Sequence, residues 1–135
     1  MSSLADRTAE IAPPGWHRLL PVLRTALVYT HGLVTEDDVL RMINEGGAQF
    51  WPTSNSVAVT ELVVYPRGTM CRIWLGAGEL SELRWIEGLI RAWARREGCM
   101  GIEIIGREGW ARALPGYIPV ATIAVHRFGA EEAGS

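Results

Sequence analysis

The sequence contains no lysine, only two cysteines and only three histidines, and each shortage excludes a class of protein. Arginine supplies all 13 positive charges against 15 acidic residues, which leaves a net charge of −2 and no broad basic field for nucleic acid. Cys71 and Cys99 are too few for a disulfide framework, and neither they nor the scattered histidines have metal-binding spacing. We therefore expect two buried free thiols, no metal site and no nucleic-acid partner.

Long apolar runs are also missing. No run approaches the roughly 18 residues that a membrane helix needs, and the first residues lack the pattern of a secretory leader. We therefore expect a soluble protein without a membrane partner. The 135 residues, of which 48% are hydrophobic, fit one packed domain with an unusually tryptophan-rich interior or contact surface. We predict a flexible N-terminal arm at 1–15, a single domain at 16–128 and a flexible tail at 129–135.

The first part of the domain is predicted to be helical. Apolar residues recur at helical spacing through 16–29, and a second helix is signalled by Thr35 with Asp38 three residues later, an acidic form of the capping box. Val34 and Val39 stand at the positions of a hydrophobic staple, and a pair of glycines follows the helix. The acidic run 36–38 therefore indicates a helix cap rather than a metal site.

The pattern then changes to strands. Segments 48–51, 57–65 and 70–75 alternate in strand fashion with tight turns between them, which predicts an antiparallel meander. A short glycine loop then leads into an amphipathic helix that begins near Leu80 and ends before Gly98, followed by a strand at 100–105, a helical turn at 109–114 and a strand at 118–128. We predict an α/β (α+β) fold in the order α-α-β-β-β-α-β-α-β, with a mixed, largely antiparallel sheet flanked by helices.

Two long stretches carry a resemblance to a known family. The stretch VTELVVYPRGTMCRIWLGAG and the helix, strand and aromatic segment after it resemble the GNAT acyltransferase superfamily. The segments AQFWPTSNSVAVTEL and GREGWARALPGY are similar in sequence to small GNAT-like proteins of bacteriophage and prophage genomes. The resemblance covers most of residues 16–128 and implies a GNAT-like central sheet.

The resemblance implies a site for acetyl-CoA or another acyl-CoA. Backbone N–H groups of Leu75, Gly76, Ala77 and Gly78 would hold its pyrophosphate where the loop enters a helix. The loop is shorter than the family's pattern of Arg or Gln, two variable residues, Gly, one variable residue, and Gly or Ala. Glu79 also adds a negative charge where a phosphate would lie. We therefore predict no cofactor firmly, and an ordinary strand-to-helix turn is the favoured interpretation of Gly76 and Gly78.

The resemblance also implies a base and an acid for N-acyl transfer. Glu61 shares a strand face with Val59 and Val63 and is the base candidate, with an ion pair to Arg72 as the structural alternative. The family often has its acid tyrosine a few residues before a Gly-Phe or Gly-Tyr pair. Gly116 and Tyr117 match that pair, but Arg112 stands five residues before Tyr117. Tyr117 is therefore the acid candidate only with a different local backbone, and packing of its ring is the favoured alternative.

These departures from the family pattern favour a function other than efficient catalysis. The first hypothesis is a GNAT-like protein that acts as a binding or structural component, associated with a virion or its assembly. Its partners would be other protein subunits, in a homo-oligomer or among virion proteins, and it would reside in the host bacterial cytoplasm or in a phage particle. The alternative is an acyl-CoA-dependent N-acyltransferase.

Overall fold

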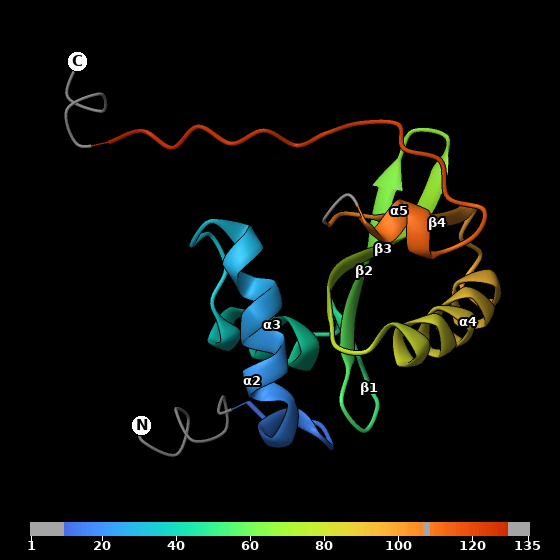
Figure 1. The fold of residues 1–135 in the computed structure, drawn as a ribbon. Coiled ribbons are helices and arrows are strands. Elements are labelled where there is room, and N and C mark those ends of the chain that lie inside the picture. The colour runs from blue at the N-terminus through green and yellow to red at the C-terminus, as the bar shows by residue number, and fades with distance from the viewer. Residues whose placement is uncertain (1–9, 107–108, 130–135) are drawn as a thin grey trace.

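The computed structural model describes residues 10–106 and 109–129 (Figure 1). The elements follow in the order α2 (Trp16–Leu27), a short 3₁₀ turn η1 (Val28–Thr30), α3 (Glu36–Asn44), β1 (Gln49–Pro52), β2 (Val57–Tyr65), β3 (Gly68–Ala77), α4 (Leu80–Arg96), β4 (Gly101–Ile104) and α5 (Gly109–Ala113). The chain is therefore a mixed α+β domain, as the change from helical to strand periodicity predicts.

One sheet of four strands organises the described residues, in the order β1-β2-β3-β4. The first three strands form the predicted antiparallel meander, and β4 lies parallel to β3 after the crossover through α4. Helices α2 and α3 lie on one side of the sheet, while α4 and α5 lie on the other (Figure 1). The longest described helix, α4, has 17 residues, and within the described ranges we find no helix long and apolar enough to cross a membrane.

Helix α3 begins with the predicted cap. The Thr35 hydroxyl accepts a hydrogen bond from the Asp38 amide at 3.2 Å, and the Asp38 carboxylate accepts one from the Thr35 amide at 2.9 Å. These hydrogen bonds, first that from the Thr35 backbone, hold the pKa of Asp38 below its ordinary value. Val39 is fully buried at the staple position. The acidic run therefore serves to begin a helix.

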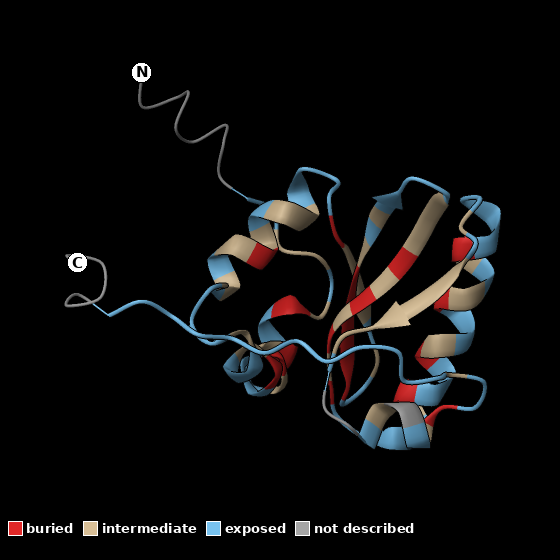
Figure 2. Cartoon of the chain, turned by 90° about the horizontal axis from the view of Figure 1, so that it is seen from above, coloured by how far each residue is buried: buried red, intermediate tan, exposed pale blue. Residues whose placement is uncertain are grey.

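The core has two halves, one on each face of the sheet (Figure 2). Val57, Val59 and Leu75 pack with α2 and α3, whereas Ile73 and Cys71 pack with α4. Leu75 and Ile73 have the same parity on β3 but face opposite sides, because the register between β2 and β3 shifts at Val59/Thr60. The extra residue is Trp74 of β3, so the facing of β3 changes on either side of it, whereas β2 keeps its alternation.

Cys71 matches the prediction for a free thiol. It is fully buried, and burial raises its pKa to about 12. Cys99 is also free but only half-buried. A thiol with so high a pKa is a packing group rather than a nucleophile.

The predicted last strand, 118–128, is not formed. Residues 117–129 adopt neither helix nor strand, and the segment runs from α5 across the molecule toward η1 (Figure 1). There the Arg127 guanidinium donates a hydrogen bond to the His31 carbonyl at 2.8 Å. The prediction was wrong because alternation measures the tendency to pair, while a strand also requires a neighbouring edge to pair with.

Most of the predicted N-terminal arm, at 1–9, and of the tail, at 130–135, lies outside the described residues. The arm's last residues do contact the domain. The Ile11 amide donates to the Asn44 side-chain oxygen at 2.8 Å, and the Asn44 side-chain nitrogen donates to the Ile11 carbonyl at 3.0 Å. Asn44, the last residue of α3, therefore fixes the chain where it enters the fold.

Candidate functional site

The glycine loop between β3 and α4 is the centre of the candidate site. Gly78 adopts a φ of 125°, in the left-handed region that favours glycine, and it lies against Ser56 from the turn between β1 and β2. The Ser56 hydroxyl accepts a hydrogen bond from the Glu79 amide at 2.8 Å, just before α4 begins. Ser56 is fully buried and therefore fixes the loop at which the resemblance implies a cofactor.

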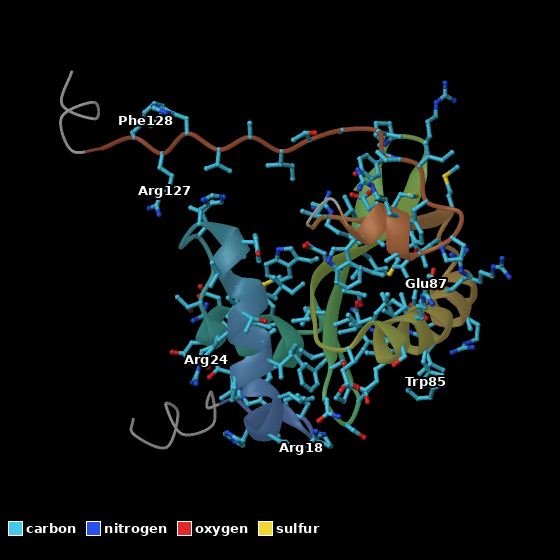
Figure 3. The ribbon with its side chains drawn as sticks, viewed as in Figure 1. Arg18, Arg24, Trp85, Glu87, Arg127 and Phe128 are labelled. Atoms are coloured by element: carbon cyan, nitrogen blue, oxygen red, sulfur yellow. The ribbon has the colours of Figure 1, made fainter. Side chains whose placement is uncertain are left out.

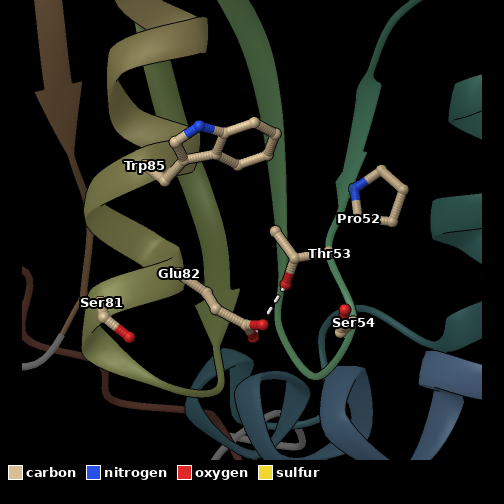
Figure 4. A pocket seen from close by; sticks show the side chains of 6 residues that line it. All are labelled: Pro52, Thr53, Ser54, Ser81, Glu82 and Trp85. Carbon is tan, nitrogen blue, oxygen red and sulfur yellow. Dashed lines mark hydrogen bonds between the residues drawn. The ribbon is translucent and has the colours of Figure 1, made fainter.

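Glu82 places a carboxylate of the chain itself at this helix start. Although it lies in the first turn of α4, its side chain turns back toward the β1–β2 turn (Figure 4). One carboxylate oxygen accepts hydrogen bonds from the Ser56 hydroxyl at 2.6 Å, the Thr53 hydroxyl at 2.9 Å and the Asn55 amide at 3.2 Å. A helix N-terminus favours an anion, and here the anion is supplied internally.

A shallow hollow lies beside this carboxylate. Its volume is about 430 Å³, and it is lined by Pro52, Thr53, Ser54, Ser81, Glu82 and Trp85 (Figure 4). Arg18 of α2 donates hydrogen bonds to the carbonyls of Thr53 and Ser54 and so secures the turn from the opposite side. The hollow is therefore the outer surface of a structural hydrogen-bond network, with the exposed indole of Trp85 on its rim.

The Glu82 network should make stability depend on pH. Its hydrogen bonds, first that from Ser56, hold the pKa of Glu82 below the ordinary value. A carboxyl whose pKa is lowered by folding stabilises the fold above its unfolded pKa, and that stabilisation disappears as the pH falls through the folded pKa. We expect the wild-type melting temperature to fall more steeply below about pH 4.5 than that of Glu82→Gln, measured by circular dichroism between pH 7 and pH 3.

Glu79→Gln is the matched control, because the neighbouring Glu79 side chain makes no capping hydrogen bond. Its melting temperature should follow that of the wild type at every pH. Parallel curves for wild type and Glu82→Gln would contradict the role given to the Glu82 carboxylate.

The resemblance also implies a place for the pantetheine arm of an acyl-CoA, against the strand edge that is left open where β3 and β4 separate. The two strands pair from Met70↔Gly101 to Ile73↔Ile104, and beyond this β3 continues alone on that side to Ala77. Trp110 of α5 lies across the gap. A Cβ added at Gly76 would lie 2.8 Å from one end of its indole, and one added at Gly106 would lie 3.0 Å from the other. The indole therefore packs against both β3, at Gly76, and the residues just after β4, at Gly106.

This contact explains one glycine in β3 and one just after β4. Gly76 and Gly106 lack side chains where the Trp110 ring approaches most closely. Leu75 and Ala77 are buried in the core on the α2 side. The four residues predicted to hold a cofactor thus lie together as expected, but each has a structural partner within the chain.

The predicted base lies on the α2 side of the sheet. Glu61 is opposite Arg72 on the neighbouring strand, as the alternative interpretation anticipated. The Arg72 guanidinium, however, donates its hydrogen bond to Glu103 of β4 at 2.9 Å. The Tyr65 hydroxyl donates to the same carboxylate at 2.7 Å. Glu61 is therefore the half-buried neighbour of a charged cluster.

The predicted acid lies on the α4 side. The Tyr117 hydroxyl donates a hydrogen bond to the Glu87 carboxylate at 2.7 Å, and the Arg91 guanidinium lies 5.9 Å from the centre of its ring. Burial first, and the Glu87 carboxylate second, raise the pKa of Tyr117 above its ordinary value. The sheet separates Tyr117 from Glu61, so the structure does not bring the two predicted catalytic residues together.

Sequence reasoning missed Ser56, Glu82 and Trp110. Glu82 stands on the polar face of a predicted amphipathic helix, and Ser56 lies in a predicted turn, so each has an ordinary local explanation. Their contact joins residues 26 positions apart. The available signal was Gly78, whose need for close approach becomes evident only when its neighbour is known.

Comparisons with known proteins show a similarity of fold alone. TTHA1254 from Thermus thermophilus is similar at a TM-score of 0.56 and 16% identity, over 84% of this chain and 93% of that one. A tetramutant of the BH1408 protein from Bacillus halodurans is similar at a TM-score of 0.62 and 10% identity, over 88% and 98%. No protein-family model and no curated protein matches the sequence.

Proposed function

We propose that the chain is a GNAT-like domain that does not bind acyl-CoA and serves as a binding or structural component, of the kind encoded by phages and prophages. One observation carries the proposal: both parts of the implied cofactor site are filled by the chain. Glu82 occupies the start of α4, and Trp110 occupies the gap between β3 and β4.

These two side chains would weaken the binding of an acyl-CoA, one at its pyrophosphate and the other at its pantetheine arm. A pyrophosphate needs positive potential and available N–H donors at the helix start. The Glu82 carboxylate opposes the first, and the Glu79 amide already donates its hydrogen bond to the Ser56 hydroxyl. A pantetheine arm would pair with the edge of β3 beyond Ile73, and the Trp110 indole lies beside that edge, against the α4 face of β3 at Gly76.

Exposed apolar side chains support a role in protein contacts. Trp85 is 61% exposed beside the hollow, and Val28, Tyr29 and Leu33 are all exposed around η1. Large apolar side chains at the surface, tryptophan above all, are favoured in protein interfaces. The partners would be other protein subunits, in a homo-oligomer or in a virion.

The association with phage rests on the segments AQFWPTSNSVAVTEL and GREGWARALPGY, which contain both Ser56 and Trp110. The protein would be made in the host bacterial cytoplasm and act in particle assembly or within the particle. We expect its gene to lie beside portal, capsid or tail genes. A neighbourhood of metabolic genes would contradict this part of the proposal.

Calorimetric titration with acetyl-CoA tests the proposal directly. We expect no heat of binding at millimolar ligand. Binding with a micromolar Kd would overturn the proposal and favour the alternative, an acyl-CoA-dependent N-acyltransferase with Glu61 as base, Tyr117 as acid and Leu75, Gly76, Ala77 and Gly78 at the pyrophosphate. Desulfo-CoA is the matched control, because it separates recognition of the pyrophosphate from reaction at the thioester.

A further inference from the structure

The C-terminal segment 118–128 is strand-like in composition but belongs to no strand of the sheet. Its sequence, IPVATIAVHRF, is rich in β-branched residues, and it runs extended from α5 across the molecule toward η1 (Figure 3). Val120 is 90% exposed and Ile118 is 80% exposed, and Ile123, Val125 and Phe128 are exposed as well. A single chain gains nothing from such a row of apolar side chains in water.

The sheet of the same chain ends in an open edge. Strand β4 pairs with β3 on one side, and among the described residues no strand pairs with its other side. Ile102 and Ile104 of β4 pack toward α4, while Glu103 faces the opposite side. A short open edge of this kind presents unpaired N–H and C=O groups to any strand that approaches.

The segment does not use the edge of its own chain. Leu114 is buried, and Tyr117 is held by Glu87 of α4, so the point from which the segment departs is fixed. From there it runs to η1, where Arg127 is bound to the His31 carbonyl (Figure 3). Eleven extended residues reach roughly 36 Å, whereas the radius of gyration expected for a domain of this size is about 14 Å. The segment is long enough to reach a neighbouring molecule.

We propose that segment 118–128 of one copy adds as a strand to the outer edge of β4 in a second copy, and that the exchange is reciprocal. Each chain carries one strand-like segment outside the sheet and an open edge at β4, so two copies related by a twofold axis satisfy both of these, while the outer edge of β1 is not used. The proposal commits to a second copy because the same chain supplies both the segment and the β4 edge, and reciprocal exchange matches them in both copies.

The composition of the segment fits this position. Apolar residues occupy both alternating faces, with Val120 on one and Ile123 and Val125 on the other, as in a strand covered on both sides. Pro119 lies at the beginning, where a strand tolerates the loss of one donor. An exchanged segment would be covered by its host's helices on one side and by the opposing copy on the other.

The test uses the full chain and reads mass and backbone protection together. Light scattering after gel filtration should give twice the chain's 14.9 kDa. Hydrogen exchange at residues 120–125 and at β4 should slow together by at least about tenfold between micromolar and submillimolar protein. Ile123→Pro removes a ladder donor and should give a monomer, whereas the matched control Ile123→Val should remain a dimer.

Three results would overturn the proposal. A monomer in which 120–125 exchange freely at every concentration would show that the segment has no strand partner. A monomer in which they are protected would place the segment on the β4 edge of its own chain. A dimer whose mass persists in Ile123→Pro, with circular dichroism unchanged, would place the interface elsewhere. None of these outcomes depends on acyl-CoA binding, so the proposed function is tested separately.

Discussion

Replacing Gly78 with alanine should lower the free energy of unfolding by about 3 kcal/mol. A left-handed backbone costs an L-residue roughly 1–2 kcal/mol, and Gly78 has a φ of 125°. The added Cβ would also lie 2.5 Å from the Cβ and 2.6 Å from the Cα of Ser56, and overpacking of this kind costs about 1–3 kcal/mol. Urea unfolding followed by tryptophan fluorescence measures the change.

Gly88→Ala is the matched control for this prediction. Gly88 lies inside α4, and an added Cβ meets nothing within 4 Å. Alanine is the better helix former, so this variant should be more stable by up to about 1 kcal/mol. If Gly78→Ala were as stable as wild type, the loop would have an alternative conformation, and Ser56 would not determine its shape.

We expect alanine to lower the free energy of unfolding at Gly78 and to raise it at Gly88, and this difference bears on function. A glycine before a helix suggests a phosphate cradle when only the sequence is known. Here the close approach of Ser56 accounts for Gly78, and the ring of Trp110 accounts for Gly76. The requirement for glycine at both positions therefore has a structural cause that needs no ligand.

Local signals were sufficient for those parts of the fold that local interactions determine. The cap at Thr35, the meander after β1 and the amphipathic helix α4 depend on neighbours within a few residues, and all three are confirmed. The element order is likewise predictable as far as α5, because each helix or strand begins at a turn signal of its own.

Contacts between residues far apart in the sequence determine the features that could not be predicted. The residue pattern of 118–128 predicts that the segment can pair as a β-strand, but it does not reveal whether the edge of a sheet lies within reach. Glu61 was assigned correctly to the face of Val59, yet nothing nearby reveals that Tyr117 lies across the sheet on α4. Glu82 and Trp110 act through contacts with Ser56 and Gly76, which only the folded chain brings together.

Trp110→Ala should be the most informative change in the gap between β3 and β4. The half-buried indole joins the ends of both strands, and its removal leaves a cavity that the two glycines cannot fill. Deleting a large ring from a packed site costs about 3–5 kcal/mol when it is fully buried, so we expect a loss of about 2–3 kcal/mol in unfolding free energy. Urea unfolding monitored by circular dichroism avoids the change in fluorescence that accompanies the loss of a tryptophan.

Trp85→Ala is the matched control, since Trp85 is 61% exposed on the rim of the hollow and should cost less than about 0.5 kcal/mol. Equal losses in the two variants would show that Trp110 does not fill the gap.

The Trp110 variant also separates the two obstacles to acyl-CoA, because it opens the edge of β3 but leaves the Glu82 carboxylate at the start of α4. Acetyl-CoA should therefore still give no heat with Trp110→Ala, and binding by this variant alone would identify the indole as the only obstacle.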